Sequence, residues 1–421
     1  MPPAATPAVL HLSLVVGGEL RDASGERLGN VDDLIVRLGE DEYPPVTGIV
    51  ASVAGRKVFV PAEQVAEVAP GQVTLLGDRL DLQHFQRRPQ EVLLRKDVLD
   101  RQLINIDGAR LVRANEIELA RLEGWYRVVG VDVGPRGLVR RLLPRAAAGR
   151  VRAGGFLDWA SVEPFTGHVP SVRLRIPHPK LARLHPAQLA DLVEAASHHE
   201  GEEILAAVAA DPELEADLFE ELEGGHRREF AEDRTDAEVA LLLSRMEADD
   251  AADFLLELPE ERRTSVIELL PAVQSRRVRA LLGFDPATAG GLMSPDFVCL
   301  YADATREEAL ERVQRSSAPA EAIAWVYAMN THRRLRGGIS LADLVRAEPG
   351  ERLWQLIEPA QTVRPDADLE EIARLMTDFD LTVLPVVDES EQLLGIVTID
   401  DVLELILPGP WRRRFGLLGE D

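Results

Sequence analysis

The chain has 421 residues, of which 46% are hydrophobic and 28% are charged, and its formal net charge is −25. This length predicts two to four domains with cores of their own, and the composition excludes a wholly disordered chain. The single cysteine, Cys299, excludes an intramolecular disulfide. No run approaches the roughly 18 apolar residues that cross a bilayer. We therefore expect a soluble protein of a reducing compartment such as the cytoplasm.

The charge is distributed unevenly along the chain. Residues 1–175 carry 23 basic and 22 acidic side chains, whereas residues 176–421 carry 24 and 50. A polyanionic surface repels nucleic acid and attracts cations. We therefore expect no nucleic-acid partner for the acidic part and consider cations as its natural ligands.

Residues 10–90 have the short Val/Ile/Leu runs of β-structure, separated by Gly, Asp and Pro. Residues 46–53 and 56–61 predict a hairpin closed by Ala54-Gly55. A weak echo, in which Gly130 and residues 137–144 match Gly48 and residues 56–61, predicts a second β-unit over 91–166. Each copy resembles the PRC-barrel family, which implies two small β-barrels that serve as an adaptor.

Residues 184–282 change to a helical pattern, with apolar residues three and four apart and Pro, Asp or Gly at the breaks. Helical stretches are predicted over 188–195, 237–243 and 251–259. Helices of about two turns are marginal alone and must bury one face against neighbours. The pattern therefore predicts a stacked helical domain over 178–285.

Residues 286–407 contain a duplicated module with repeats of about 286–350 and 351–407. Each copy includes the pattern Gly-x-x-(Ser/Thr)-x-x-Asp, at 337–343 and at 395–401, which is typical of a strand, a turn and a helix. A basic and aromatic tail, residues 408–421, follows. We find no pattern of a nucleophile, a general base or a phosphate-binding loop, and we expect a protein that is not an enzyme.

Three stretches carry a second resemblance: 249–259 (Asp-Asp-Ala-Ala-Asp to Leu-Glu-Leu-Pro), 284–295 and 374–403. Together they resemble the cytosolic region of MgtE-type magnesium transporters, an N domain followed by a tandem CBS pair, here without the transmembrane domain. The resemblance covers 184–407. The expected fold class is multidomain α+β: two small PRC-type β-barrels, an all-α superhelical N domain, and a tandem CBS (α/β) pair.

The resemblance implies acidic residues that sense Mg²⁺ between these domains. Mg²⁺ prefers hard oxygen ligands and keeps several waters, so carboxylates from two surfaces can share it. The candidate ligands, carried over by position, are Asp249, Asp253, Asp368, Glu370, Asp380, Asp401 and Glu404. The alternative for each is a helix cap or a solvated side chain.

The two Gly-x-x-(Ser/Thr)-x-x-Asp patterns resemble the nucleotide-binding signature of CBS repeats. The resemblance implies ATP or another adenine nucleotide as a cofactor, held through Ser340 and Asp343 in one cleft and Thr398 and Asp401 in the other. The alternative is a helix N-cap in which the carboxylate lies in the first turn. Asp401 is a candidate for both ligands, which excludes serving both at once.

The resulting hypothesis is a Mg²⁺-responsive regulatory protein with Mg²⁺ as its cofactor. Its expected partners are a second copy, through face-to-face CBS pairs, and a separately encoded membrane transporter that would bring it to the inner face of the membrane. One alternative is an adenine-nucleotide sensor in which the metal is secondary. Another is a PRC-barrel adaptor in RNA or ribosome processing.

Overall fold

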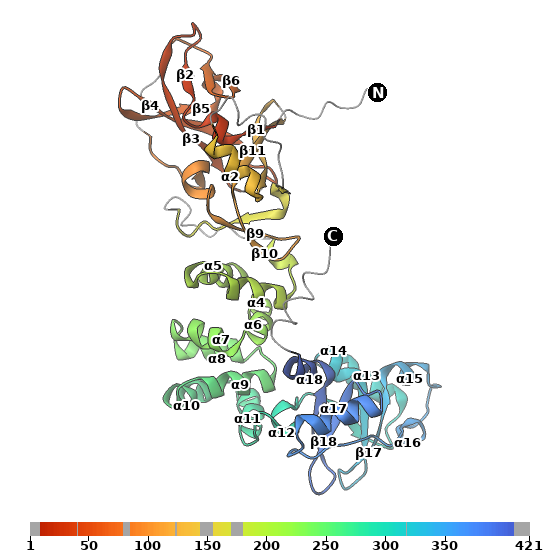
Figure 1. Cartoon of the computed structure of the whole chain (residues 1–421). Coiled ribbons are helices and arrows are strands. Elements are labelled where there is room, and N and C mark those ends of the chain that lie inside the picture. The colour runs from red at the N-terminus through yellow and green to blue at the C-terminus, as the bar shows by residue number, and fades with distance from the viewer. Residues whose placement is uncertain are drawn as a thin grey trace. The chain divides into compact units, whose positions relative to one another are not determined.

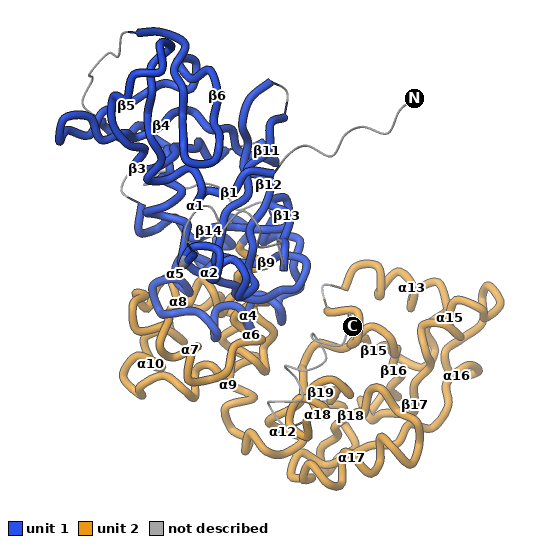
Figure 2. Tube along the Cα trace, turned by 45° about the horizontal axis from the view of Figure 1, so that its top comes forward, with its two compact units in different colours: residues 1–211 blue, residues 212–421 orange. Residues whose placement is uncertain are grey.

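The computed structural model describes residues 9–39, 41–78, 85–122, 124–143, 155–169, 180–316 and 318–407. The predicted tail over 408–421 lies outside them. The chain divides into two compact units, Met1–Asp211 (unit 1) and Pro212–Asp421 (unit 2) (Figures 1 and 2). Within the described ranges, the structure contains no helix that combines the length and the apolar character of a membrane span.

Unit 1 is built mainly from three β-sheets. The largest has the order β5-β4-β3-β2-β7-β6, with β8 also paired to β3; the others have the orders β1-β11-β12-β13 and β10-β9-β14. The strands are β1 Leu10–His11, β2 Glu19–Arg21, β3 Arg27–Arg37, β4 Val46–Val53, β5 Arg56–Pro61, β6 Val65–Ala69, β7 Gln72–Leu75, β8 Glu91–Leu93, β9 Gln102–Asn105, β10 Arg110–Arg113, β11 Glu116–Leu122, β12 Trp125–Asp132, β13 Phe156–Asp158 and β14 Val162–Pro164.

The predicted hairpin is confirmed. β4 and β5 pair antiparallel, and Val53 lies opposite Arg56 at the end of the ladder. The two turn residues, Ala54 and Gly55, have φ angles of 48° and 80°. Positive φ at both central residues matches the twist of the flanking strands, which is why a two-residue loop suffices.

The predicted internal repeat is confirmed at Gly48 and Gly130. It is wrong for residues 137–144, which the repeat matches to the strand over 56–61. A Cβ atom on Gly48 would lie 2.4 Å from Cε2 of Phe59, and one on Gly130 would lie 2.2 Å from Cε2 of Phe156, so each glycine admits a ring from the neighbouring strand. The counterpart of β5 is therefore β13, whereas residues 137–142 belong to a helix, α2 (Pro135–Leu142). Pro135 favours helix there, because its fixed φ suits the first helical position.

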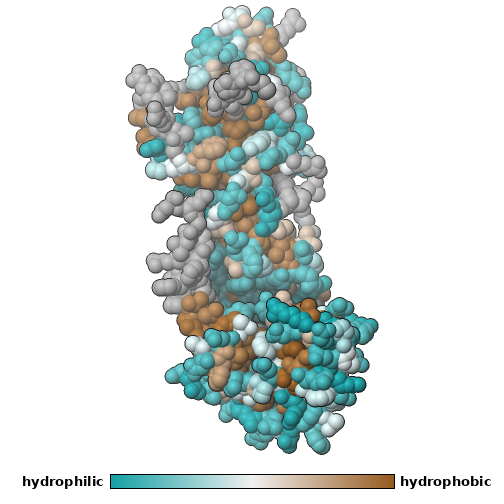
Figure 3. Space-filling model, turned by 90° about the vertical axis from the view of Figure 1, so that its right-hand side faces the viewer, coloured by the Kyte–Doolittle hydropathy of each residue, from teal (hydrophilic) through white to brown (hydrophobic). Residues whose placement is uncertain are grey.

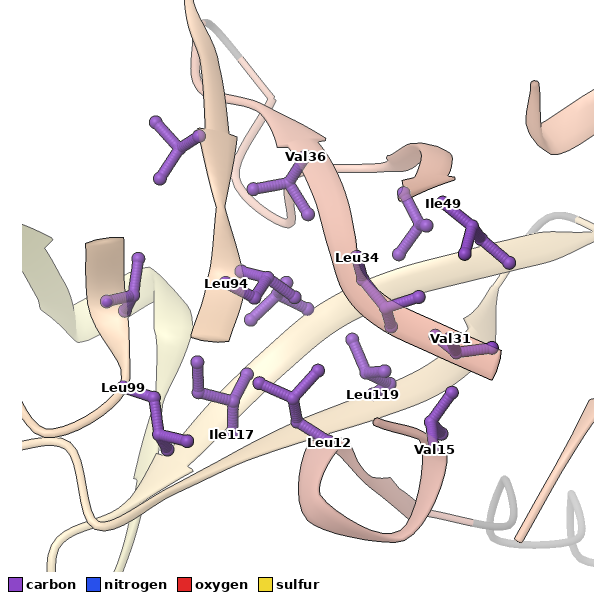
Figure 4. Close-up of a cluster of buried hydrophobic side chains, with 14 of the residues drawn as sticks. Leu12, Val15, Val31, Leu34, Val36, Ile49, Leu94, Leu99, Ile117 and Leu119 are labelled. Atoms are coloured by element: carbon purple, nitrogen blue, oxygen red, sulfur yellow. The ribbon is translucent and has the colours of Figure 1, made fainter. Parts of the chain in front are cut away.

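The two β-units share strands and one hydrophobic core. β1, at the start of the chain, pairs with β11, and β8 pairs with β3. The shared core includes Leu12, Leu34, Ile49, Ile117 and Leu119, whose side chains point toward one another in Figure 4. The observed strand orders are open ones, so the prediction of two PRC-type barrels is not confirmed as closed barrels.

Short helical turns connect these strands, and two longer helices follow them in unit 1. α5 begins after Ser197, whose main chain and hydroxyl both donate to Glu200. The turns and helices are α1 Leu12–Val15, η1 Ala62–Gln64, η2 Leu94–Val98, η3 Trp159–Ser161, η4 Leu181–Arg183, α4 Pro186–Ala195 and α5 His198–Val208.

Unit 2 begins with six helices of two to three turns. They are α6 Pro212–Glu221, α7 Gly224–Glu232, α8 Asp236–Leu243, α9 Ala248–Glu257, α10 Glu260–Leu269 and α11 Ala272–Leu281. Each packs on the next but one: α6 on α8, α7 on α9, α8 on α10 and α9 on α11. This alternation gives the stacked array that the short apolar repeats predict, because α8 and α9 each pack on two of the other helices, so that all six take part.

Residues 289–407 form two α/β repeats. In the first, β15 (Val298–Tyr301) pairs parallel with β16 (Trp325–Met329), which pairs antiparallel with β17 (Leu335–Ser340). In the second, β18 (Val383–Val387) pairs antiparallel with β19 (Leu393–Thr398). Their helices are α12 Ala289–Leu292, α13 Arg306–Gln314, α14 Ala320–Ile323, α15 Leu341–Arg346, α16 Leu353–Leu356, α17 Leu369–Asp378 and α18 Ile399–Ile406.

Candidate metal centre

The predicted acidic pair lies on one face of α9. Asp249 and Asp253 are four residues apart, and Glu257 continues the same stripe one turn later. α9 packs against α7 and α11, which places this stripe against other parts of unit 2. The stripe ends at a cation, because Arg227 donates to Glu257 over 2.8 Å. At the other end of the stripe, Asp249 has acidic neighbours, which are Glu247 just before α9 and Asp401 on α18.

A second acidic pair, on α18, faces this stripe. Asp401 acts on Asp249, and Glu404 acts on Asp253; each raises the pKa of the α9 carboxyl that it faces. Four of the seven predicted metal ligands therefore lie near enough to influence one another, on two helices about 150 residues apart in sequence, although among the described residues no three of their oxygens lie within 4.8 Å of one another. The two helices present like charges to each other, an arrangement that opposes their contact unless the charge is neutralised.

Two glutamates extend the acidic cluster, and sequence reasoning missed both. Glu247 precedes α9, and Glu220 at the end of α6 accepts a hydrogen bond of 2.7 Å from the Glu247 main chain. Burial raises the pKa of each to about 7, and the charge of Glu220 contributes to the shift of Glu247. The signal for them is tertiary, since neither is spaced from Asp249 along a common helix face. Asp250, next to Asp249, is the last member that was not predicted.

Burial dominates the electrostatics of the cluster. The pKa of Asp249 is raised well above its usual value, first by desolvation and then by Asp401 and Glu247. Desolvation likewise raises the pKa values of Asp253 and Asp401 to about 6. The Oδ1 atom of Asp249 is buried and has no hydrogen-bond partner within the described part of the chain. A buried carboxylate oxygen without a partner is costly, and a bound cation removes that cost.

The donor set fits a hard divalent cation. The cluster offers carboxylate oxygens and no sulfur, and such donors suit Mg²⁺, Mn²⁺ and Ca²⁺. The members are Glu220, Glu247, Asp249, Asp250, Asp253, Asp401 and Glu404. We refer to these seven residues as the acidic cluster.

Three predicted ligands lie apart from the acidic cluster. Asp368 caps α17 by accepting a hydrogen bond of 2.9 Å from the Glu371 main chain. Glu370 is exposed in the first turn of α17, and Asp380 is exposed just beyond its end, with a φ angle of 53°. Asp368 is thus a helix cap and Glu370 a solvated side chain in this structure, and their role as metal ligands stays a prediction.

The residues predicted to bind nucleotide act as helix caps. Ser340 caps α15: its hydroxyl donates to Asp343 over 2.7 Å, and the Asp343 main chain donates back to it over 3.1 Å. Arg346 lies 3.2 Å from the other carboxylate oxygen of Asp343. Together these contacts hold the pKa of the exposed Asp343 below its usual value, the Ser340 hydrogen bond contributing most.

Thr398 precedes α18 and is bonded to Asp401 in the first turn of that helix. Its hydroxyl donates to Oδ2 of Asp401, and its main chain donates to the same oxygen over 3.2 Å. Thr398 is buried, and Asp401 faces Asp249. Of the two ligands considered for Asp401, this environment favours a cation over a ribose hydroxyl.

Known protein families match the part of the chain that contains the acidic cluster. Residues 184–287 match the MgtE intracellular N domain, and residues 289–350 and 356–408 match the CBS domain. The magnesium transporter MgtE of Thermus thermophilus is 41% identical over 162 residues, which are 38% of this chain and 36% of that protein. MgtE of Bacillus subtilis is 30% identical over 171 residues, 40% of this chain and 38% of that protein. The matched part is thus a little over a third of the length of these relatives.

Two solved structures resemble the same part of the chain. One is the cytosolic domain of the Mg²⁺ channel MgtE in complex with ATP, with a TM-score of 0.51 and 34% identity over 53% of this chain and 92% of that one. The other is the soluble part of a magnesium transporter, with a TM-score of 0.50 and 26% identity over 54% of this chain and 90% of that one. Residues 184–408 are therefore an MgtE intracellular N domain followed by a CBS pair, related to the cytosolic region of MgtE magnesium transporters.

Proposed function

We propose that the chain is a Mg²⁺-responsive regulatory protein whose switch is the acidic cluster. The observation that carries this proposal is the buried Oδ1 of Asp249, which faces Asp401 and Glu247. Without a cation, like charges on α9 and α18 repel, which favours their separation. With a cation, the same carboxylates become ligands and hold the N domain against the CBS pair. Couplings of about 1–3 kcal/mol suffice for such a switch.

Calorimetric titration of the whole chain with Mg²⁺ tests this proposal. We expect saturable binding that Asp249→Asn/Asp401→Asn abolishes. A matched control is Asp368→Asn/Glu370→Gln, which removes two acidic charges outside the acidic cluster; Asn at position 368 keeps the helix cap. Loss of binding in the control, or its survival in the cluster variant, would place the ion elsewhere.

Small-angle scattering without Mg²⁺ and at a Mg²⁺ concentration that saturates binding in the calorimetric titration tests the conformational part. The ionic strength is matched with NaCl, so that screening alone cannot produce the change. We expect compaction in Mg²⁺ that Asp249→Ala/Asp253→Ala removes. Equal scattering profiles in a protein that binds Mg²⁺ would leave a metal site without a switch.

Adenine-nucleotide binding is a second candidate function. It is supported by the solved MgtE cytosolic domain, which is a complex with ATP, and by the half-buried Ser340 at the end of β17 with the exposed Asp343 in the first turn of α15. Titration with ATP and with AMP in EDTA separates it from the metal hypothesis. Binding without Mg²⁺ that Asp343→Asn weakens would make the nucleotide the primary ligand.

The remaining parts of the proposal concern assembly and place. We propose a non-enzymatic protein at the inner face of the membrane that acts on a separately encoded transporter. Its docking part would be the β-units over 10–90 and 91–166. Its sensor would be the helical domain over 178–285 together with the CBS pair over 286–407. Figure 3 shows apolar patches on an otherwise largely hydrophilic face. Around α17 and α18, Phe379, Leu403, Leu405 and Ile406 are exposed, which supports a homodimer through the CBS pairs. Light scattering of the whole chain and of Leu403→Glu/Ile406→Glu tests this interface: we expect a dimer and a monomer, respectively.

A further inference from the structure

Unit 1 contains an open groove of about 580 Å³ in the sheet formed by β3, β4 and β5. Phe59, which lines the groove, packs on its other side against a small buried apolar cluster of Ile35, Val50 and Leu93. Alternate residues of β5, Val58 and Val60, belong to the shared core instead, because successive strand residues point to opposite faces. The groove therefore lies on the sheet face that the shared core leaves uncovered. Its volume is within the usual range for ligand sites.

Charged and aromatic side chains line the groove together. Those that carry the argument are Arg37, Phe59, Pro61, Glu63, Arg88 and Trp125. The groove thus combines two cationic groups and one carboxylate with an apolar wall. Arginine and tryptophan are the residue types that most often dominate binding energy at protein interfaces.

The walls of the groove are fixed in place. The guanidinium carbon of Arg88 lies 4.8 Å from the centre of the Phe59 ring, a cation–π contact that holds the charge over the groove. Trp125 donates its indole N–H to the Val46 carbonyl over 2.6 Å and meets the Tyr126 ring edge-on at 5.8 Å. Groups that are already ordered lose little entropy when a ligand binds.

Both arginines of the groove keep their charge available. Arg37 and Arg88 are exposed, and their guanidinium groups form no ion pair with the side chains that the structure describes. The neighbouring Arg87, in contrast, pairs with Asp97 over 3.0 Å. A guanidinium presents a planar fork of donors that matches a carboxylate, so two of them mark a place for two acidic groups.

We propose that this groove binds an acidic peptide segment of a partner protein, with Arg37 and Arg88 holding two carboxylates and Trp125 and Phe59 holding an aromatic or aliphatic side chain between them. The open side of the groove suits a chain that enters and leaves, whereas a small ligand there would remain largely in water. The proposal concerns unit 1 alone and does not depend on the acidic cluster of unit 2.

Peptide selection tests the proposal even while the partner protein is unidentified. A random octapeptide phage library is panned on the whole chain and counter-selected on the Arg37→Gln/Arg88→Gln variant. We expect the recovered peptides to carry at least two Asp or Glu residues beside an aromatic or large aliphatic residue. No enrichment, or enrichment of neutral or basic peptides, would overturn the proposal.

Fluorescence anisotropy with the most enriched peptide then measures the contributions. We expect Arg37→Gln/Arg88→Gln to weaken binding by about 100-fold or more, since each of the two charge-assisted contacts contributes about tenfold. Arg56→Gln/Arg110→Gln removes two exposed arginines outside the groove and should leave binding unchanged, and both variants should melt at the same temperature as the unsubstituted chain. Replacing Asp and Glu in the peptide by Asn and Gln should abolish binding. Equal binding by both variants, or by the neutral peptide, would contradict a carboxylate site.

Discussion

Buried carboxylates occur in both units, and the two units accommodate them differently. In unit 1, Glu116 and Asp132 are fully buried, and Nη1 of Arg140, itself fully buried, lies 3.9 Å from an oxygen of each. Ser13 donates both its main-chain and hydroxyl groups to Glu116. In unit 2, the end of the acidic cluster around Asp249 has carboxylates as its neighbours. In unit 1 the positive charge is the side chain of Arg140. In unit 2 we propose that it is a metal ion bound from solution.

The histidine of unit 1 fits the same comparison. Arg140 lies 3.2 Å from Nδ1 of His11, which accepts its hydrogen bond. Burial, aided by the charge of Arg140, lowers the pKa of His11 to about 4. The imidazole is therefore neutral at pH 7, and Arg140 provides a positive charge between Glu116 and Asp132. Because Arg140 already stands beside Glu116 and Asp132, we expect the stability of unit 1 to respond less to Mg²⁺ than the stability of unit 2.

Removal of the built-in cation should have the largest effect. Arg140→Met leaves Glu116 and Asp132 buried without their positive neighbour, and we expect unit 1 to lose about 3–5 kcal/mol of unfolding free energy. Hydrogen exchange of β11 and β12 peptides measures this loss locally. Arg136→Gln, on the same helix but exposed, is the control and should change it by less than about 0.5 kcal/mol. Adding Glu116→Gln to Arg140→Met should recover part of the loss; no recovery would mean that packing, not charge, is responsible.

In unit 2, substitutions that remove charge should raise the unfolding free energy, whereas Arg140→Met lowers it in unit 1. Asp249→Asn/Asp401→Asn removes repulsion, so the protein without Mg²⁺ should become more resistant to hydrogen exchange in α9 and α18. In the unsubstituted protein, Mg²⁺ at 100 times its dissociation constant should add about 2.7 kcal/mol. The variant should gain nothing from Mg²⁺. An equal gain in β11 and β12 would show that the ion acts generally on the acidic chain and not at this cluster.

The stability of unit 2 and its affinity for Mg²⁺ should both depend on pH, because acidic residues of the cluster release protons when a cation binds. The pKa values of Glu220 and Glu247 are raised to about 7 in the folded protein, so between about pH 4.3, the unfolded value, and pH 7 the folded state binds more protons than the unfolded state. Unit 2 without metal should therefore lose stability as the pH rises through this window. A cation must displace these protons, so Mg²⁺ affinity should rise by about tenfold per pH unit for each proton released.

Calorimetry in buffers of different ionisation enthalpy counts those protons directly. We expect release near pH 6.5 and little release at pH 8, where the glutamates are already ionised. Glu220→Gln/Glu247→Gln should reduce the number of protons released and leave the part that comes from Asp249, Asp253 and Asp401. Affinity that stays constant from pH 6 to pH 8 would place the ion away from these two glutamates.

Sequence reasoning found what local spacing encodes. The four-residue interval between Asp249 and Asp253 predicts a shared helix face, and the structure places both on one face of α9. Glu220 and Glu247 could not be found in this way, because they meet through the hydrogen bond between the end of α6 and the start of α9. The facing of α9 by α18 came from the family resemblance, since no local pattern relates helices so distant in sequence.

The error in unit 1 has a physical cause as well. Residues 137–144 carry Leu138-Val139 and Leu142-Leu143, a composition that also suits a strand. The helix prevails because it carries Arg140 to the buried carboxylates and Arg141 to Asp100, whose oxygens lie 2.6 Å from the Arg141 guanidinium. Leu138 and Val139 remain exposed as a result. Tertiary pairing of charge thus decided between two local alternatives.

The smallest expected effect is at Asp343, which belongs neither to the buried carboxylates of unit 1 nor to the acidic cluster of unit 2. Asp343 is exposed and its partners, Ser340 and Arg346, are local, so the cap at α15 should contribute only modestly to stability. We expect Ser340→Ala to cost about 1 kcal/mol, measured by hydrogen exchange in α15, because one main-chain donor loses its acceptor. Ser340→Asn keeps an acceptor and should cost less. Mg²⁺ affinity should be the same in both variants, since an exposed carboxylate is satisfied by water and local donors whereas a buried one requires a counter-charge. A change in Mg²⁺ affinity would mean that the CBS clefts and the acidic cluster are coupled, and would join the two candidate functions into one.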